Sequence, residues 1–182
     1  MSEVEDLAIL YDKRVKELGY AARSVGWQSK EQQDLRFQML TEDISLAGQS
    51  IVDLGCGFGD FYEFLCSSDM TPSKYVGIDI SDEMLRVAKE IHSEIPGVTF
   101  INRPLMGSTQ ETYDFAVASG SLNYNLKVDM NMYLKDFVEV YKLRVRKGLL
   151  LNLLTTKVDY MQEMHVHYSP DFVRELFLKH FE

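Results

Sequence analysis

Alternating glycines that follow a carboxylate are the feature of this sequence with the clearest chemical meaning. They lie within residues 51–60, where Asp53 precedes Gly55, Gly57 and Gly59. Glycine adopts positive φ at no steric cost and lets a backbone approach a ligand closely. Where such a turn enters a helix, its amides face outward and attract a polar or anionic ligand. The segment therefore predicts a small-molecule site at a strand-to-helix turn.

Two other glycine-rich turns have different spacings and are disfavoured here. A nicotinamide or flavin site has the pattern G-x-G-x-x-G, which would place a glycine at position 60. Asp60 occupies that position, and its negative charge opposes a pyrophosphate. A P-loop requires Gly-Lys-Ser/Thr, which this segment lacks. These differences argue against a nicotinamide-dependent oxidoreductase and against a P-loop.

A second carboxylate, Asp79, lies near the end of the apolar run at residues 75–80. A carboxylate accepts hydrogen bonds from both hydroxyls of a vicinal diol such as a ribose. Dinucleotide sites also use such an acid, so Asp79 by itself does not identify the ligand.

Together these segments resemble class I S-adenosylmethionine-dependent methyltransferases. The spacing from Asp53 to Gly59 is similar to motif I of that family, Asp79 matches the acid after its second strand, and residues 113–124 look like its fourth-strand motif. The pair Leu35-Arg36, about 20 residues before motif I, resembles the small-molecule methyltransferases of the ubiquinone-biosynthesis type. The resemblance covers roughly residues 30–180.

The resemblance implies S-adenosylmethionine as cofactor and S-adenosylhomocysteine as product. It assigns the ribose hydroxyls to Asp79 and the cofactor carboxylate to Arg36, since a guanidinium pairs with a carboxylate bidentately. An exposed helical arginine is the alternative for Arg36. The implied cofactor-binding residues are Arg36, Asp53, Gly55, Gly57, Gly59, Asp79, Ile80, Met84, Ser119 and Gly120.

No strong catalytic constellation is present, and methyl transfer needs none, because alignment supplies most of the acceleration. A base is needed only where the acceptor must lose a proton. The catalytic candidates are Tyr124, His165 and His167. The two histidines alternate, so an extended segment places both on one side. They could serve as a base or a metal pair, or be polar loop residues.

Several other residues have two interpretations each. Tyr11, Tyr20 and Trp27 could cage a sulfonium by cation–π contact, whereas Trp27 could instead pack in the core. Asn123 lines the pocket or lies in a loop. Asp114 starts a strand and is expected to be structural, and Cys56 is not expected to be a nucleophile. No metal is assigned.

The order of helices and strands predicts a doubly wound, Rossmann-like α/β fold with a mostly parallel sheet and helices on both faces. Leu35, Met39 and Leu40 supply the apolar face of the helix that begins at Ser29. The predicted strands are 50–54, 75–80, 98–101, 115–118 and 148–154, and the later helices lie near 61–65, 81–91, 130–145 and after 169.

Two domain-level expectations follow. Residues 1–28 form a helical segment that lids the site, and residues 29–182 form the cofactor-binding domain. The family sheet ends in a hairpin of strands six and seven, for which this sequence has no residues. The fifth strand is then an exposed apolar edge that invites pairing, such as a homodimer, unless a partner or the N-terminal segment covers it.

Composition limits the function classes. The chain has 182 residues, a formal charge of −9 and two cysteines. This acidity disfavours nucleic-acid binding, and no apolar run is long enough for a membrane span. The sequence therefore predicts a cytoplasmic methyltransferase with a small-molecule acceptor. The alternative on the same fold is a non-catalytic module that only binds the cofactor.

Overall fold

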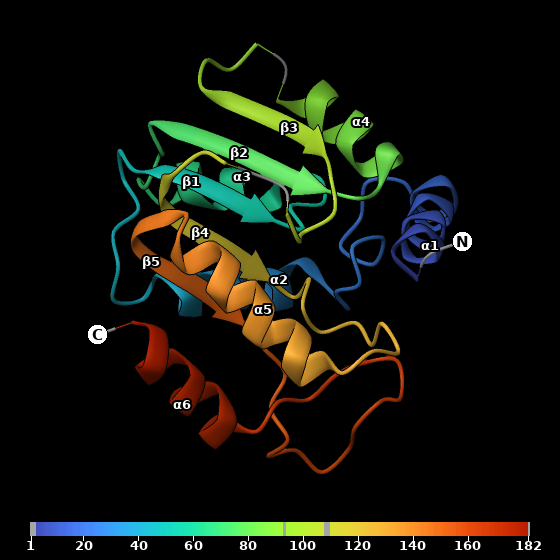
Figure 1. Cartoon of the computed structure of the whole chain (residues 1–182). Coiled ribbons are helices and arrows are strands. Elements are labelled where there is room, and N and C mark those ends of the chain that lie inside the picture. Colours follow the sequence, from blue (N-terminus) through green and yellow to red (C-terminus); the bar gives the residue numbers. More distant parts are fainter. Residues whose placement is uncertain (1–2, 93, 108–109, 182) are drawn as a thin grey trace.

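A parallel sheet forms the centre of the molecule (Figure 1). The computed structural model describes residues 3–92, 94–107 and 110–181. The five strands follow the order β3-β2-β1-β4-β5, and every neighbouring pair is parallel. The strands are β1 (Ser50–Leu54), β2 (Lys74–Asp79), β3 (Val98–Asn102), β4 (Tyr113–Ser119) and β5 (Val145–Asn152).

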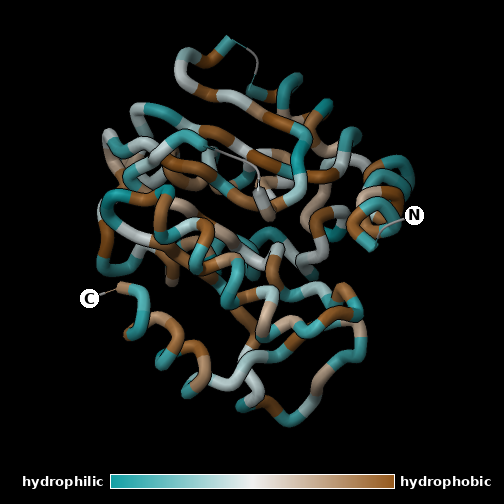
Figure 2. Tube along the Cα trace, viewed as in Figure 1, coloured by the Kyte–Doolittle hydropathy of each residue, from teal (hydrophilic) through white to brown (hydrophobic). Residues whose placement is uncertain are grey.

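Helices cover both faces of this sheet, as the alternation of side chains requires. Ile51, Tyr75 and Phe115 point to a face that packs against α2, α3 and α4. Val52 and Ala116 point to the opposite face, against α5 and α6. Apolar residues accordingly run along the strands and the inward faces of the helices (Figure 2). The helices are α1 (Glu3–Leu18), α2 (Lys30–Thr41), α3 (Asp60–Ser67), α4 (Asp82–Ile91), α5 (Met130–Lys142) and α6 (Pro170–His180). The doubly wound fold is confirmed.

The strand order reverses between β1 and β4, and this point positions the site. The first connection runs outward from β1 to β2 and β3, whereas the chain then returns to β4 on the other side of β1. Ligands of open α/β sheets bind at such a switch point, beyond the carboxyl ends of the strands. Helix α1 lies beyond those ends (Figure 1).

The buried face of α2 differs from the predicted one. Ser29 caps the helix as expected, by accepting from the Gln32 amide at 3.3 Å. Leu35 and Met39, however, are 54% and 59% exposed, while Phe37 is buried. Leu40, the third predicted residue, is partly buried and packs against the same cluster as Phe37, as expected. The Phe37 ring packs against the rings of Phe61 and Phe64 on α3. A helix buries only one face against the core, and the contacts with Phe61 and Phe64 turn the face that carries Phe37 inward.

The boundary between α5 and β5 also differs. A helix to about 145 and a strand from 148 were expected, but α5 ends at Lys142 and β5 begins at Val145. Pairing with β4 explains the difference, because Val145 lies opposite Tyr113 in the sheet. Charged residues at the start of an edge strand hide this pairing from a hydrophobicity pattern.

Strand β5 is the edge of the sheet, since within the described residues it pairs only with β4. Its faces are covered by packing with both helical layers, through Leu149 on one side and Leu150 on the other. No strand follows α6 in the part of the chain that the structure describes. None of the described helices is long and apolar enough to cross a membrane.

The aromatic cluster on α2 is tested by two matched truncations. Phe37→Ala removes a buried ring and is expected to lower the free energy of unfolding by about 3 kcal/mol. Leu35→Ala removes an exposed side chain and is expected to change it by less than about 0.5 kcal/mol. Urea unfolding measures both. A larger loss for Leu35→Ala would mean that the sequence-predicted face is the buried one.

Candidate functional site

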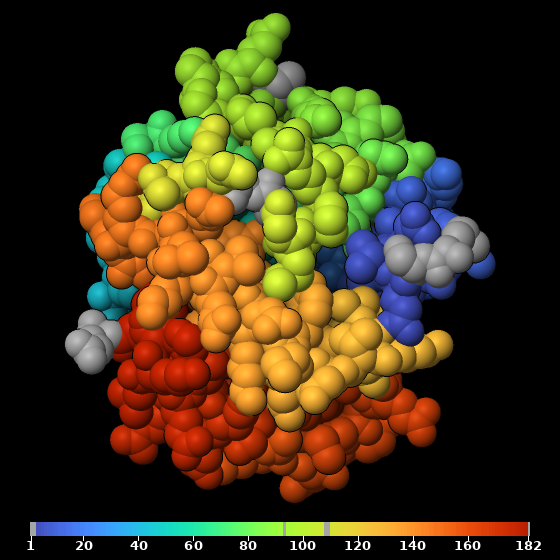
Figure 3. Space-filling model, viewed as in Figure 1, coloured from blue at the N-terminus to red at the C-terminus, as the bar shows by residue number. Residues whose placement is uncertain are grey.

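A cavity of about 1000 Å³ lies at the carboxyl ends of the strands. Its walls come from α1 and the segment after it, the turn after β1, the end of β2, and the loops after β3, β4 and β5. In Figure 3 the blue N-terminal segment and the yellow-green segment after β3 flank this recess. Distant parts of the chain therefore meet at one site, as the topology predicts.

The glycine turn after β1 is hydrogen-bonded to β2, and its neighbours leave no space for a side chain at Gly55 or Gly57. The amides of Gly55 and Cys56 donate to the Ile78 carbonyl, at 2.7 and 3.1 Å. Gly55 and Gly57 both have positive φ, 82° and 55°. A Cβ at Gly55 would collide with Ser121, and one at Gly57 would lie 2.8 Å from Val25 Cγ1. Neighbouring elements thus hold this backbone against the cavity.

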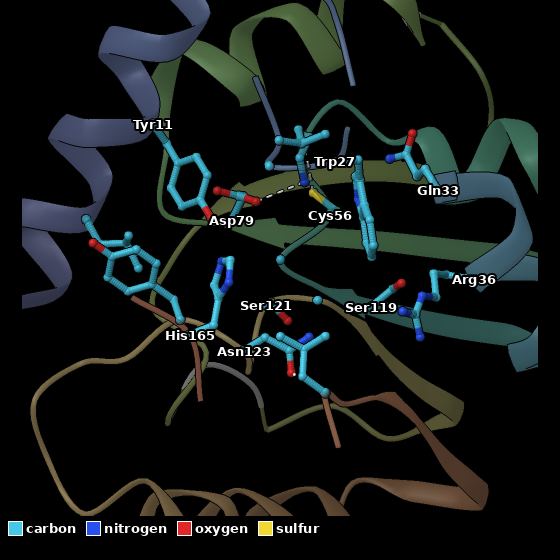
Figure 4. Close-up of a pocket in the computed structure, with 18 of the residues that line it drawn as sticks. Tyr11, Trp27, Gln33, Arg36, Cys56, Asp79, Ser119, Ser121, Asn123 and His165 are labelled. Carbon is cyan, nitrogen blue, oxygen red and sulfur yellow. Dashed lines mark hydrogen bonds between the residues drawn. The ribbon is translucent and has the colours of Figure 1, made fainter. Parts of the chain in front are cut away.

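Asp79 is the best-defined polar group of the cavity. One carboxylate oxygen accepts from the Gly57 amide at 2.9 Å, and the other accepts from the Ser81 amide at 3.0 Å. Burial raises the pKa of Asp79, and these amides act in the opposite direction. Each oxygen retains a further lone pair, so the carboxylate can still accept from two hydroxyls. Figure 4 shows it facing the cavity beside Tyr11.

Gly59 belongs to a different environment from the other two glycines. It precedes α3 with φ 85°, and a Cβ there would lie 2.7 Å from His92 Nε2. It does not line the cavity, unlike the nine other residues that the resemblance assigns to the cofactor. Gly59 is required for packing between α3 and its neighbours.

Asp60 and Tyr20 are bound to each other. Asp60 accepts from Tyr20 Oη and from Gln33 Nε2, each at 3.1 Å, and Lys30 Nζ lies 3.7 Å from its carboxylate. Tyr20 Oη also donates to Glu63 at 3.2 Å. Tyr20 is therefore outside the cavity lining, whereas Tyr11 and Trp27 belong to it.

Asp53 lies beneath the glycine turn and is fully enclosed. Burial raises its pKa to about 7, although the hydroxyl of Tyr75 donates to it and lowers that value. The negative charge of Asp79 raises it further. Asp53 therefore gains a proton within the neutral range, and its Tyr75 hydrogen bond fixes the end of β1 to β2.

Helix α2 contributes Gln33 and Arg36 to the end of the cavity opposite Tyr11 (Figure 4). Gln33 is buried, and its Oε1 has no hydrogen-bond partner among the described residues. The Arg36 carbonyl accepts from Asn152 Nδ2 at 3.0 Å, and the same nitrogen donates to Ser119 Oγ at 3.2 Å. Sequence reasoning missed Gln33, although its position one helical turn before Arg36 was the available signal.

Tyr124, His165 and His167, the catalytic candidates, all line the cavity. Asn123 joins their two loops, because its Oδ1 accepts from the Leu154 amide at 3.0 Å and its carbonyl from the Val166 amide at 2.8 Å. Burial lowers the pKa of His165, and His167 and Arg14 lower it further. No metal-type cluster of three His, Cys, Asp or Glu side chains occurs among the described residues.

The segment before α2 contributes Val25, Gly26 and Trp27 to the lining of the cavity. Trp27 packs over Gly120, where an added Cβ would lie 3.1 Å from its ring. Helix α1 is tied to the start of α4, because Asp12 accepts from Ser81 Oγ at 2.6 Å. Val15 packs with Met84, which also lines the cavity together with Ile80.

Cys56 and Asp114, for which the sequence predicted no catalytic role, lie in very different surroundings. Burial raises the pKa of the Cys56 thiol well above its usual range, so the group is a neutral thiol. Asp114 accepts from the Ser50 amide and hydroxyl, at 2.9 and 2.7 Å, and these bonds lower its pKa. It starts β4, at the end of the sheet opposite the cavity, and its role is structural.

Residues 51–143 match the family model described as "Methyltransferase domain". The protein named "Putative methyltransferase Rv1506c" of Mycobacterium tuberculosis (strain ATCC 25618 / H37Rv) is 30% identical over 113 residues, which span 60% of this chain and 66% of that protein. The "Ubiquinone biosynthesis O-methyltransferase" of Methylococcus capsulatus (strain ATCC 33009 / NCIMB 11132 / Bath) is 37% identical over 71 residues, 39% of this chain and 28% of that protein. The chain thus covers less than two thirds of either relative.

A solved structure shows the same fold. The magnesium protoporphyrin IX methyltransferase of Synechocystis PCC 6803, crystallised with bound S-adenosylmethionine, superposes with a TM-score of 0.68. The match covers 99% of this chain and 86% of that chain, at 16% identity. At that identity the likeness concerns the fold alone.

Asp53 gives a test by pH. Its pKa of about 7 in the folded chain exceeds the ordinary 3.8, so the folded state binds the proton more tightly than the unfolded state. Stability contributed by protonated Asp53 is present below pH 4 and lost as pH rises to 7, by about 4 kcal/mol at most. Asp53→Asn keeps an acceptor for Tyr75 and removes this loss. Chemical unfolding between pH 4 and 8 should show wild type falling relative to the variant.

Asp114→Asn is the matched control, because its hydrogen bonds lower the pKa. Stability contributed by the Asp114 carboxylate is present above its ordinary pKa and lost at more acid pH, so this variant should not flatten the slope from pH 4 to 7. Parallel curves for wild type and Asp53→Asn over that window would contradict the account of Asp53.

Proposed function

This chain belongs to the class I S-adenosylmethionine-dependent methyltransferase family, and we propose that it methylates a small-molecule acceptor in the cavity described above. The observation that carries the proposal is the pairing of the glycine turn with Asp79 at the switch point of the sheet. Backbone amides fix a buried carboxylate at the edge of a cavity large enough for a cofactor and a small acceptor. Likeness to a ubiquinone biosynthesis O-methyltransferase, over 39% of the chain, supports a small acceptor.

Three features of the cavity fit the cofactor. Asp79 offers two oxygens to the ribose hydroxyls. Arg36 lies on α2 at the opposite end and suits the carboxylate. The unpartnered, buried Gln33 Oε1 is an acceptor that suits the adjacent ammonium group, since a buried acceptor without a donor is costly. Ile80 and Met84 supply apolar surface beside Asp79 for the base.

When bound, S-adenosylmethionine supplies a methyl group activated by its sulfonium and leaves as S-adenosylhomocysteine. The residues of the chain align the reactants, which is the main contribution such a reaction needs. His165 is the candidate to take a proton from an acceptor that must lose one. Its lowered pKa keeps the imidazole neutral at pH 7, so a ring nitrogen can accept that proton.

The N-terminal segment, residues 1–28, acts in this proposal as a lid over the cofactor. Tyr11 and Trp27 line the cavity from this segment, and Asp12 holds α1 to Ser81. Residues 29–182 then form the cofactor-binding domain. Because Trp27 is the sole tryptophan in the chain, its fluorescence reports directly on what enters beneath the lid.

Replacement of Asp79 tests the cofactor site. Asp79→Ala removes two acceptors for the ribose and is expected to weaken S-adenosylhomocysteine binding by about 100-fold, because hydrogen bonds to charged groups contribute about 1.5–3 kcal/mol each. Isothermal titration calorimetry gives the affinity, and the melting temperature establishes that the variant is folded.

Asp136→Ala is the control, because Asp136 is an exposed acid on α5 outside the cavity. It should bind S-adenosylhomocysteine like the wild type. Unchanged affinity in folded Asp79→Ala would refute the assigned ribose contact. Tight cofactor binding with no transfer of a labelled methyl group to any member of a broad small-molecule panel would refute the proposed activity.

A further inference from the structure

The acidic and the basic residues of the cavity lining come from different elements of the fold. The acids come from β1, α3 and the end of β2, whereas the bases come from the N-terminal segment, from α2 and from the loop after β5. The acids are Asp53, Asp60 and Asp79, and the bases are Arg14, Arg23, Arg36, His165 and His167. This is unexpected in a chain with a net charge of −9. Arg14, Arg23 and Arg36 therefore supply positive charge from elements that contribute none of the acids of the lining.

Arg14 is the central cation among these arginines. It is half-buried on α1, and its guanidinium carbon lies 5.2 Å from the centre of the Tyr11 ring. Within the described residues it forms no ion pair, whereas Arg86 on the surface pairs with Glu83 and Glu90. Its guanidinium lies close to Gly26, where an added Cβ would be in van der Waals contact with Arg14 Nη1 at 3.9 Å.

His165 lies within electrostatic reach of this arginine. His167 and Arg14 both lower the pKa of His165, and Tyr124 pairs with His165 through an isolated bridge. No carboxylate of the cavity lining comes from the elements that carry these four residues. A half-buried guanidinium without a carboxylate partner is a ready site for an anion.

The rest of this half of the cavity is mainly apolar. It is formed by the start of α1 and by the loops after β4 and β5. The side chains are Val4, Leu7, Leu126, Val158, Tyr160 and Met164. A ligand that fits here combines an anionic group with an apolar body, because the anion then contacts Arg14 and the apolar body contacts the apolar side chains.

We propose that the methyl acceptor is an apolar small molecule bearing a carboxylate or phosphate group, and that Arg14 pairs with that group. The inference rests on the proposed function, because it assigns the half of the cavity that the cofactor leaves open. Arg36 on α2 serves the cofactor carboxylate and Arg23 is exposed, which leaves the half-buried Arg14 for the acceptor. An anion there is also attracted by the positive sulfonium of the cofactor.

Trp27 fluorescence tests the proposal on the full chain saturated with S-adenosylhomocysteine. The probes are phenylacetate, phenyl phosphate and the neutral phenylacetamide. Phenylacetate or phenyl phosphate should bind at least about tenfold more tightly than phenylacetamide, and the stronger of the two identifies the anion preferred. Arg14→Gln should lose at least about tenfold in affinity for that anion, whereas Arg14→Lys should recover part of the loss.

Arg174→Gln, an exposed arginine on α6, is the matched control and should bind the anion like the wild type. S-adenosylhomocysteine binding is measured for every variant. If it binds and phenylacetamide equals the anions, or no anion binds, the acceptor inference fails while the cofactor site stands. If Arg14→Gln weakens S-adenosylhomocysteine itself, Arg14 belongs to the cofactor and the inference is overturned. If wild type does not bind S-adenosylhomocysteine, the proposed function fails instead.

Discussion

The site depends on a buried carboxylate that is held by amides and not by a cation. Asp79 joins the glycine turn, through Gly57, to the start of α4, through Ser81. Ser81 in turn donates to Asp12 on α1, so the N-terminal segment is fixed by the same junction. Neutral donors orient the carboxylate without neutralising its charge, which keeps its remaining lone pairs available to a ligand. The Asp79–Ser81 segment at the end of β2 therefore fixes the positions of the glycine turn, α4 and α1 relative to one another.

The cavity has two parts of different chemistry, one lined by buried carboxylates and one lined by Arg14 and apolar side chains. The carboxylates beneath the turn are held in an environment that raises the pKa values of Asp53 and Asp79, and the hydroxyl of Tyr75 and two amides partly compensate. Arg14 supplies positive charge among the apolar side chains that the start of α1 and the loops after β4 and β5 contribute to the cavity, beside the neutral His165. The first half suits the cofactor, and the second half determines which acceptors can enter beside it.

Local signals predicted the parts of this account that depend on neighbouring residues. The glycine turn, the five strands and the caps at Ser29 and Ser81 each follow from short-range geometry, and the structure has them. Long-range contacts decide the rest. Phe37 is buried because α3 supplies an aromatic cluster, and the start of β5 follows from its pairing with β4. Arg14 and Gln33 enter the site only when α1 packs against α4 and α2 packs against the sheet, which no local pattern encodes.

A crystal structure of this chain with S-adenosylhomocysteine tests the central claim most directly. Both ribose hydroxyls should lie within hydrogen-bond distance of the two Asp79 oxygens, with the amino-acid end of the ligand directed toward Gln33 and Arg36. A ligand whose ribose is bound by another residue, or whose carboxylate pairs with Arg14, would contradict the division of the cavity into cofactor and acceptor halves.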